Sequence, residues 1–389
     1  MNAGSYAKPL DDSEKATTAF CAALHLDSGR LSVREGLTAL LSRDLVVAPM
    51  SLDDHRARLK RFPAHADSLH ALFRYWARVH QNDRAFCAAG VLTFLKSADA
   101  AETTFYAEGC SWLAHETQGR LTQPELEALV HPGARNPLFE LLRAIGGQLA
   151  TLYPPRFDLL GVDRRADRLK DDSVLCKAVR SVAQVFGVGE FEVYQARRTR
   201  VDLETSEPLS VCVGHDLARK YNLREQKFLL GRAALGLLNK TAVLKKLSVT
   251  EATELLGNSV RIHQPGYAGL GSRNDGASKR LRKAYSWKAV RAIAAPALAI
   301  ARGEPLDVAH TIEALGWSAD RAGLIVCGDV AAGLDMLLRD DPSAPGLRTS
   351  DRAQVLGAVA KRRELRELLT YALSDDFFCL RARLGLTVH

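Results

Sequence analysis

The chain has 389 residues, which allows two or three domains and leaves ample length for a buried core. Hydrophobic residues make up 47% and charged residues 25%, a balance typical of soluble globular proteins. The 53 Lys and Arg residues exceed the 45 Asp and Glu residues by eight, which is a weak indication of an anionic partner.

The cysteines and the N-terminal residues indicate the cellular compartment of the protein. The seven cysteines are scattered and never form a CxxC pair, which favours free thiols in a reducing compartment over a disulfide framework. The start, MNAGSYAKPLDDSEK, has no apolar core and does not resemble a signal peptide. No run approaches the roughly 20 apolar residues that span a bilayer. A cytoplasmic protein without a membrane span is therefore expected.

Residues 1–50 are predicted to contain a disordered lead and short helices, and residues 51–155 a set of helices joined by short turns. Part of the second region resembles one tetratricopeptide repeat, a motif of 34 residues. The residues that carry this resemblance are Leu69, Leu72, Trp76, Asp83, Ala85 and Ala89. No second full copy follows, and an array needs about three copies. We therefore expect one helical hairpin packed on its neighbours, and an ordinary hairpin explains the pattern as well.

Residues 156–389 form the third predicted region, after Pro154 and Pro155. A charged connector spans 156–170, and two short strands are expected at 190–194 and 209–213, paired as a small sheet edge. Arg197, Arg198 and Arg200 between them are expected in a solvated loop. Further helices are predicted at 121–131, 137–153, 174–186, 298–316, 321–338, 352–369 and 377–384. The predicted fold is mainly α, an N-terminal helical-hairpin region followed by an α+β module with a small β edge.

The stretch 214–238 has the order strand, GHDL, turn and helix, with the apolar run Phe228-Leu229-Leu230-Gly231. Farther on lies Ala319-Asp320-Arg321-Ala322-Gly323-Leu324. Both segments resemble the HtpX-like zinc metallopeptidases. In that family the helix carries His-Glu-x-x-His, whose histidines bind zinc while the glutamate activates water, and the later segment supplies a third ligand. A helical hairpin before such a module resembles a pairing found in bacterial repeat proteins of uncertain role.

This resemblance implies that the metal site has been lost. The two histidine positions are occupied by Arg232 and Gly236, the base position by Ala233, and the third-ligand position by Gly316. Arginine keeps its proton and cannot bind a metal. The resemblance implies a pseudo-peptidase with no metal, cofactor or catalytic residue. If the ancestral geometry is kept, Arg232 and Asp320 should form an ion pair in place of the zinc.

A simpler explanation of the same helix is close packing. Gly231, Ala233, Ala234 and Gly236 are small enough to let two helices approach each other, with no ancestral site involved. This explanation leads to the same expectation of no metal.

Two further segments have a distinctive composition. The glycine-rich stretch 257–278 has no preceding strand and no GKS or GKT, so a mobile surface loop is expected and a phosphate-binding loop is not. Residues 279–293 are predicted to form a basic amphipathic helix. Its candidate interaction residues are Arg280, Arg282, Lys283, Trp287, Lys288 and Arg291. Nucleic acid, an anionic membrane surface or an acidic protein could use this face, and a merely solvated face is the alternative.

Three functional hypotheses remain open. The leading one is a non-catalytic interaction or scaffold protein that binds another protein. The alternative is nucleic-acid binding through 279–293, which would fall steeply with salt. The third is an enzyme of unrecognised chemistry, which a buried carboxylate with a raised pKa in a cleft would favour.

Overall fold

The computed structural model describes residues 51–113, 116–339 and 350–388. Within this part the fold is mainly helical with a small three-stranded mixed sheet, so the predicted fold class is confirmed. The helices predicted within residues 1–50 lie outside the described residues. None of the described helices is both long and apolar enough to cross a bilayer.

The N-terminal part is a stack of four helices. They are α3 (Leu52–Arg61), α4 (Ala66–Arg78), α5 (Asn82–Phe94) and α6 (Ala100–Trp112). The predicted hairpin is α4 and α5, in which Leu69, Leu72 and Trp76 are buried at the spacing of one helix face. Ser51 and Asp99 begin α3 and α6 with capping boxes, which satisfy the free N–H groups of the first turn.

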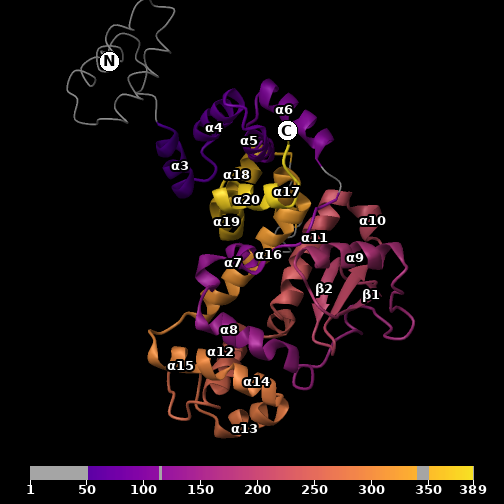
Figure 1. The fold of residues 1–389 in the computed structure, drawn as a ribbon, viewed down its shortest axis with the longest axis vertical. Coiled ribbons are helices and arrows are strands. Elements are labelled where there is room, and N and C mark those ends of the chain that lie inside the picture. The colour runs from indigo at the N-terminus through magenta and orange to yellow at the C-terminus, as the bar shows by residue number, and fades with distance from the viewer. Residues whose placement is uncertain (1–50, 114–115, 340–349, 389) are drawn as a thin grey trace, which may run out of the picture.

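The C-terminal helices lie against this stack (Figure 1). They are α17 (Val330–Arg339), α18 (Arg352–Lys361), α19 (Arg363–Ala372) and α20 (Asp375–Arg383). The Phe378 ring packs edge-on against Trp76 of α4, with centroids 5.8 Å apart. The fully buried Arg381 pairs with Asp83 of α5 at 2.7 Å. One hydrophobic core therefore contains residues from both ends of the described chain.

The sheet has the order β1-β3-β2, from β1 (Glu192–Ala196), β2 (Val201–Glu204) and β3 (Ser210–Gly214). The two predicted strands are β1 and β3, which pair in parallel. Arg197, Arg198 and Arg200 lie in the turn between β1 and β2, and Arg197 and Arg198 are exposed, as predicted. The sequence analysis missed β2, which pairs antiparallel with β3. Every residue of β3 is buried, as expected of a central strand. Helix α9 (Val174–Val185) and α11 (Leu223–Leu238) pack nearby.

Helices α11 and α16 (Val308–Cys327) cross at very close range. A Cβ on Gly231 of α11 would lie 2.7 Å from the Ala322 carbonyl oxygen and 2.4 Å from Val326 Cγ2. A Cβ on Gly323 of α16 would lie 2.7 Å from the Phe228 carbonyl oxygen. Because neither glycine has a side chain, the two helix backbones can pack in direct contact. Gly231 therefore has the close-packing role that the sequence suggested for it.

A second core holds the lower part of the molecule together (Figure 1). Its elements are α8 (Pro137–Ile145), α12 (Val249–Val260), α13 (Asp275–Ala284), α14 (Trp287–Ala292), α15 (Ala294–Arg302) and the first half of α16. Helix α7 (Gln123–Leu129) precedes this region in the chain. Three short 3-10 helices also occur, namely η3 (Pro132–Ala134), η4 (Gly146–Gln148) and η5 (Ala242–Lys246). The long α16 contributes to both cores, because Leu315 belongs to this one and Leu324 to the other.

Several predicted helices are shorter than expected. The one predicted at 137–153 ends at Ile145, the one at 321–338 is divided at Gly328, and the one at 352–369 is divided at Arg362. Gly328 has φ 74°, a left-handed conformation that ends a helix readily in glycine. Apolar periodicity continues through such breaks, so the pattern alone does not reveal them.

The region 257–293 also differs from its prediction. Residues 257–260 belong to α12 and are buried, and the basic helix predicted at 279–293 is two helices, α13 and α14. Tyr285 has an extended backbone at the corner, and the Ser286 side chain caps α14 by accepting from the Ala289 N–H. A serine cap satisfies the N–H groups of a new first turn, which favours two short helices here.

Candidate functional site: a basic pocket between α11, α16 and the sheet

The chain enters the site along β3, turns through α10 (Leu217–Lys220) and continues into α11. Asn222 begins α11 with a capping box, since its side chain accepts from the Glu225 N–H at 3.0 Å and Glu225 accepts from the Asn222 N–H at 2.8 Å. The succession strand, short helix, turn and long helix is the one on which the family resemblance rests. The capping box fixes the residue at which α11 begins.

A cavity of about 820 Å³ lies between α11, α16, η5 and the β1–β2 turn with β2. Its apolar wall includes Leu229 of α11, Leu244 of η5 and Leu315 of α16. Cationic residues form most of its polar lining: Arg197, Arg198, Arg200, Lys220, Arg232 and Lys245. Its carboxylates are Asp202 and Asp216. The volume of this pocket is typical of ligand-binding sites, and its lining is more highly charged than is usual for them.

The residues predicted for the vestigial metal site meet at this pocket. Arg232, Ala233 and Gly236 of α11 and Gly316 of α16 all line it. Asp320 lies one turn beyond Gly316, with a side chain that is 5% exposed. Its Oδ1 is 2.8 Å from Arg232 Nε, so the ion pair predicted from the sequence is present. Two segments more than 80 positions apart in the printed sequence are thus joined where the resemblance places the metal.

The glycines of the pocket differ in the space around them. A Cβ on Gly316 would meet no atom within 4 Å, so this residue faces open space. A Cβ on Gly236 would lie 2.5 Å from Leu203 Cδ1 of β2. Gly236, to which the resemblance assigns the second histidine, is therefore closed by a leucine, and any larger side chain there would need Leu203 to move.

Ion pairs already neutralise part of the positive lining. Asp216 accepts a hydrogen bond from Lys220 at 2.6 Å, which lowers the pKa of the Asp216 carboxyl. Lys245 pairs with Asp202, and Arg197 pairs with Asp167 at 3.1 Å. Arg232 pairs with Asp320, so the six lining cations face four carboxylates, and the pocket keeps an excess of two positive charges. The chemistry of the lining therefore favours an anionic ligand with apolar parts.

Sequence reasoning missed most of this lining. Arg197, Arg198 and Arg200 were recognised as a basic run but expected in a solvated loop, and Lys220 and Lys245 were not singled out. The clustering of three arginines beside the segment that carries the resemblance was the signal available. Its meaning depends on η5 and α16, which reach the same place from later in the chain.

A group of side chains that could hold a metal ion lies away from the pocket. Among the described residues, one group of His, Cys, Asp or Glu side chains is compact enough to hold an ion: His70, Asp99 and Glu102. Its contacts already have a structural explanation, because Asp99 and Glu102 form the capping box of α6 and Glu102 Oε1 lies 2.6 Å from His70 Nδ1. The pocket lining contains no histidine or cysteine.

A perturbed carboxylate is also found outside the pocket. Burial raises the pKa of Asp335 on α17, and Lys96 and Arg339 partly oppose that shift. Asp335 does not line the pocket. The carboxylate whose pKa is raised by burial therefore lies outside this pocket.

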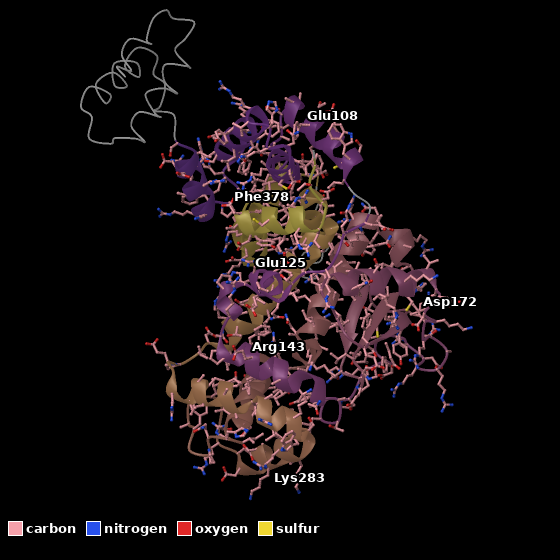
Figure 2. The ribbon with its side chains drawn as sticks, viewed as in Figure 1. Glu108, Glu125, Arg143, Asp172, Lys283 and Phe378 are labelled. Carbon is pink, nitrogen blue, oxygen red and sulfur yellow. The ribbon has the colours of Figure 1, made fainter. Side chains whose placement is uncertain are left out.

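The six candidate interaction residues of 279–293 are all exposed and belong to a different surface. They lie on α13 and α14, at the end of the molecule where Figure 2 labels Lys283. None of them lines the pocket. The structure therefore separates the two predicted sets of residues.

In comparisons with known proteins, no family model matches the sequence, and no characterised protein or solved structure shows significant similarity to it.

Proposed function

We propose that the chain is a non-catalytic, cytoplasmic interaction protein built on a degenerate zinc-peptidase fold, and that the basic pocket binds an acidic segment of a partner protein. The observation that carries the proposal is that the four positions of the lost ligands and base line one open pocket of about 820 Å³. A substrate groove without its chemistry is suited to holding a chain without cutting it.

The residues at the pocket support a binding role without catalysis. Arg232 replaces a ligand and is tied to Asp320, and neither Ala233 nor Gly316 offers a group that could activate water or bind an ion. The arginines of the β1–β2 turn extend the positive wall toward solvent, and Arg198 is exposed. Arginine forms bidentate hydrogen bonds with carboxylates, so acidic side chains are the natural partners.

Gly316 makes a direct test possible. Because its Cβ position is open, Gly316→Trp would fill the pocket without a clash near the backbone. Gly357 is the matched control, since it too lies within a helix, α18, and has no atom within 4 Å of its Cβ position. Peptides displayed on phage would be selected on the full chain, and enriched sequences would be measured by fluorescence anisotropy.

The expected result is enrichment of sequences that combine Asp or Glu with apolar residues. Gly316→Trp should weaken their binding by about tenfold or more, as expected when a buried side-chain contact is lost, and Gly357→Trp should not change it. Absence of enrichment, or equal binding by both variants, would count against the pocket. Cleavage of the bound peptides, followed by mass spectrometry, would replace the scaffold proposal with the enzyme hypothesis.

The nucleic-acid alternative makes a different prediction. It would use residues 279–293, none of which lines the pocket, so pocket variants should leave it intact. Oligonucleotide binding that falls steeply with salt would support it. Elemental analysis of protein purified without chelator gives a further check, since one zinc per chain would contradict a lost metal site.

A further inference from the structure

The net charge of the protein is concentrated in one short segment. Residues 276–303 contain seven Lys and Arg residues and no Asp or Glu. Without these seven, the chain has 46 cations against 45 carboxylates, so the remainder is almost neutral. A charge excess confined to one segment indicates an anionic partner at that place.

The fold puts this segment at an end of the molecule. Helices α13 and α14 occupy the lower end of the long axis in Figure 1, and Lys283 marks that end in Figure 2. We call α13, α14 and the corner between them the basic tip. Its exposed cations are Lys279, Arg280, Arg282, Lys283, Lys288 and Arg291. No ion pair joins any of these six to a carboxylate of the described chain.

The orientation of α13 follows from its one buried residue. Leu281 packs into the lower core, whereas Lys279, Arg280, Arg282 and Lys283 fall on the opposite side. At 3.6 residues per turn these four cations span an arc of about 160° centred opposite Leu281. The apolar side of the helix is thus used for the core, and the whole cationic side faces solvent.

Trp287 stands at the corner between the two helices. It is the first residue of α14, it is 76% exposed, and the Arg291 guanidinium lies 5.6 Å from its ring. The neighbouring Tyr285 is 5% exposed and its hydroxyl is 2.9 Å from that of Ser259. One tryptophan therefore projects from the tip, surrounded by cations.

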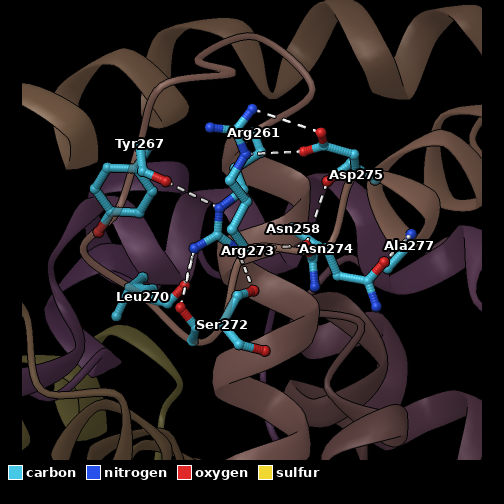
Figure 3. Close-up of polar contacts among 11 residues, drawn as sticks. Asn258, Arg261, Tyr267, Leu270, Ser272, Arg273, Asn274, Asp275 and Ala277 are labelled. Carbon is cyan, nitrogen blue, oxygen red and sulfur yellow. Dashed lines mark hydrogen bonds and ion pairs between the residues drawn. The ribbon is translucent and has the colours of Figure 1, made fainter.

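The loop that precedes α13 is hydrogen-bonded to a buried arginine. Arg261 of the glycine-rich stretch is 4% exposed and donates to a series of backbone carbonyls (Figure 3). Its Nε donates to the Tyr267 oxygen at 2.9 Å, and Nη2 donates to the Leu270 oxygen at 2.7 Å. Nη1 donates to the Ser272 oxygen at 3.0 Å. These contacts tie the loop carbonyls of Tyr267, Leu270 and Ser272 to Arg261, which directly follows α12.

From these observations we infer that the basic tip docks on an anionic membrane surface, with Trp287 in the headgroup layer and the surrounding Lys and Arg residues against acidic lipids. Tryptophan favours the membrane–water interface because it combines an apolar ring with a polar N–H. A cluster of six cations falls within the range of basic patches that bind acidic lipids.

The shape of the tip favours a membrane over nucleic acid. Proteins that bind single strands use a groove with several aromatic platforms. The basic tip has one exposed aromatic ring, because Tyr285 is buried and bonded within the core. A projecting end with one tryptophan can touch a flat surface, and binding of this kind needs no transmembrane helix.

The test is flotation of the full chain with vesicles of phosphatidylcholine, with and without phosphatidylglycerol. Binding is expected to the acidic vesicles and to fall as salt is raised. Trp287→Ala should weaken vesicle binding by roughly tenfold, because partial burial of a large apolar side chain contributes a free energy of about that size. The matched control is Trp112→Ala, because Trp112 is 64% exposed on α6 at the other end of the molecule.

The contribution of the basic residues to vesicle binding is tested with the same flotation assay. The triple variant Lys279→Glu, Lys283→Glu and Lys288→Glu should lose binding by more than about a hundredfold, since each cation near an acidic surface contributes about a fivefold factor. Its control reverses three exposed cations elsewhere, Lys60, Arg74 and Lys177, with the same change in net charge. Circular dichroism would verify that every variant is folded.

Each outcome decides the inference. Loss of vesicle binding in both tip variants, with both controls unchanged, supports it. Equal loss in the control triple would show a nonspecific effect of net charge and overturn it. Failure to bind acidic vesicles also overturns it, and tight binding of a duplex or single-stranded oligonucleotide in that case would assign the tip to nucleic acid.

Discussion

Arg232 of α11 and Asp320 of α16 form an ion pair with 2.8 Å between Nε and Oδ1. The aspartate side chain is 5% exposed, whereas the arginine side chain is 29% exposed and reaches the pocket. The pair is therefore asymmetric. Water can replace the partner of the arginine more readily than that of the carboxylate.

This asymmetry predicts unequal costs of mutation. Arg232→Met should lower the free energy of unfolding by about 3 kcal/mol, because a buried carboxylate loses its cation. Asp320→Asn should cost about 1 kcal/mol, since Arg232 can be hydrated from the pocket. Urea unfolding measures both, and the double variant should resemble Asp320→Asn alone. Equal single costs that add in the double variant would contradict the described coupling.

Two helical glycines are expected to respond in opposite ways to alanine. Gly316→Ala should raise the stability by about 0.5–1 kcal/mol, because its Cβ position is open and alanine favours helix. Gly231→Ala should lower it by about 1–3 kcal/mol, since the new methyl group would overlap Val326 and the Ala322 carbonyl. Thermal unfolding of the two variants side by side is the measurement. A stabilising Gly231→Ala would refute the close crossing of α11 and α16.

Arg381 is expected to tolerate no conservative change. It is fully buried, its Nε and Nη2 donate to Asp83, and Nη2 also donates to the Leu386 carbonyl at 2.8 Å. Lysine cannot reproduce this planar set of donors, so Arg381→Lys should cost about 3 kcal/mol or more. Arg383→Lys is the control, because Arg383 is 49% exposed, and it should cost less than about 1 kcal/mol. Chemical denaturation of both variants would decide.

The buried carboxyl of Asp335 predicts a pH dependence. Its pKa is raised by burial, so the folded state holds the proton more tightly than the unfolded chain. The stability that this proton contributes is present below the unfolded pKa, near 3.9, and is lost as pH rises through the folded value. Asp335→Asn should therefore stabilise the protein at neutral pH, on the order of 1 kcal/mol, with an advantage that shrinks on acidification.

Thermal unfolding across pH 4 to 7, a range that begins near the unfolded pKa of about 3.9, measures this effect. Asp172→Asn is the control, because Asp172 is exposed (Figure 2). An advantage of Asp335→Asn that does not vary with pH would point to packing instead of titration.

Local chemistry in the sequence determined the main helices. Apolar spacing at Leu69, Leu72 and Trp76, and polar caps such as Asp99 and Asn222, depend on neighbours within one or two turns. A short window of sequence therefore contains all the residues needed to predict such a helix. The ion pair of Arg232 with Asp320 was also predictable, though from resemblance to a family with a known arrangement.

Other features depended on contacts between distant segments. Strand β2 has four residues, two of them acidic, and forms because the fully buried β3 offers it a partner. Helix breaks at Gly328 and at the Tyr285 corner leave the apolar pattern unchanged. Periodicity reports which face is buried, not where the backbone turns.

The sequence by itself thus determined the helical class and the basic character of residues 279–293. Only the tertiary structure decided that the β1–β2 arginines share one pocket with Gly316, and that the cations of α13 and α14 lie at an exposed tip around Trp287. The physical reason is that secondary structure follows from local preferences, whereas a pocket or a charged surface is made by segments that meet only when both cores are packed.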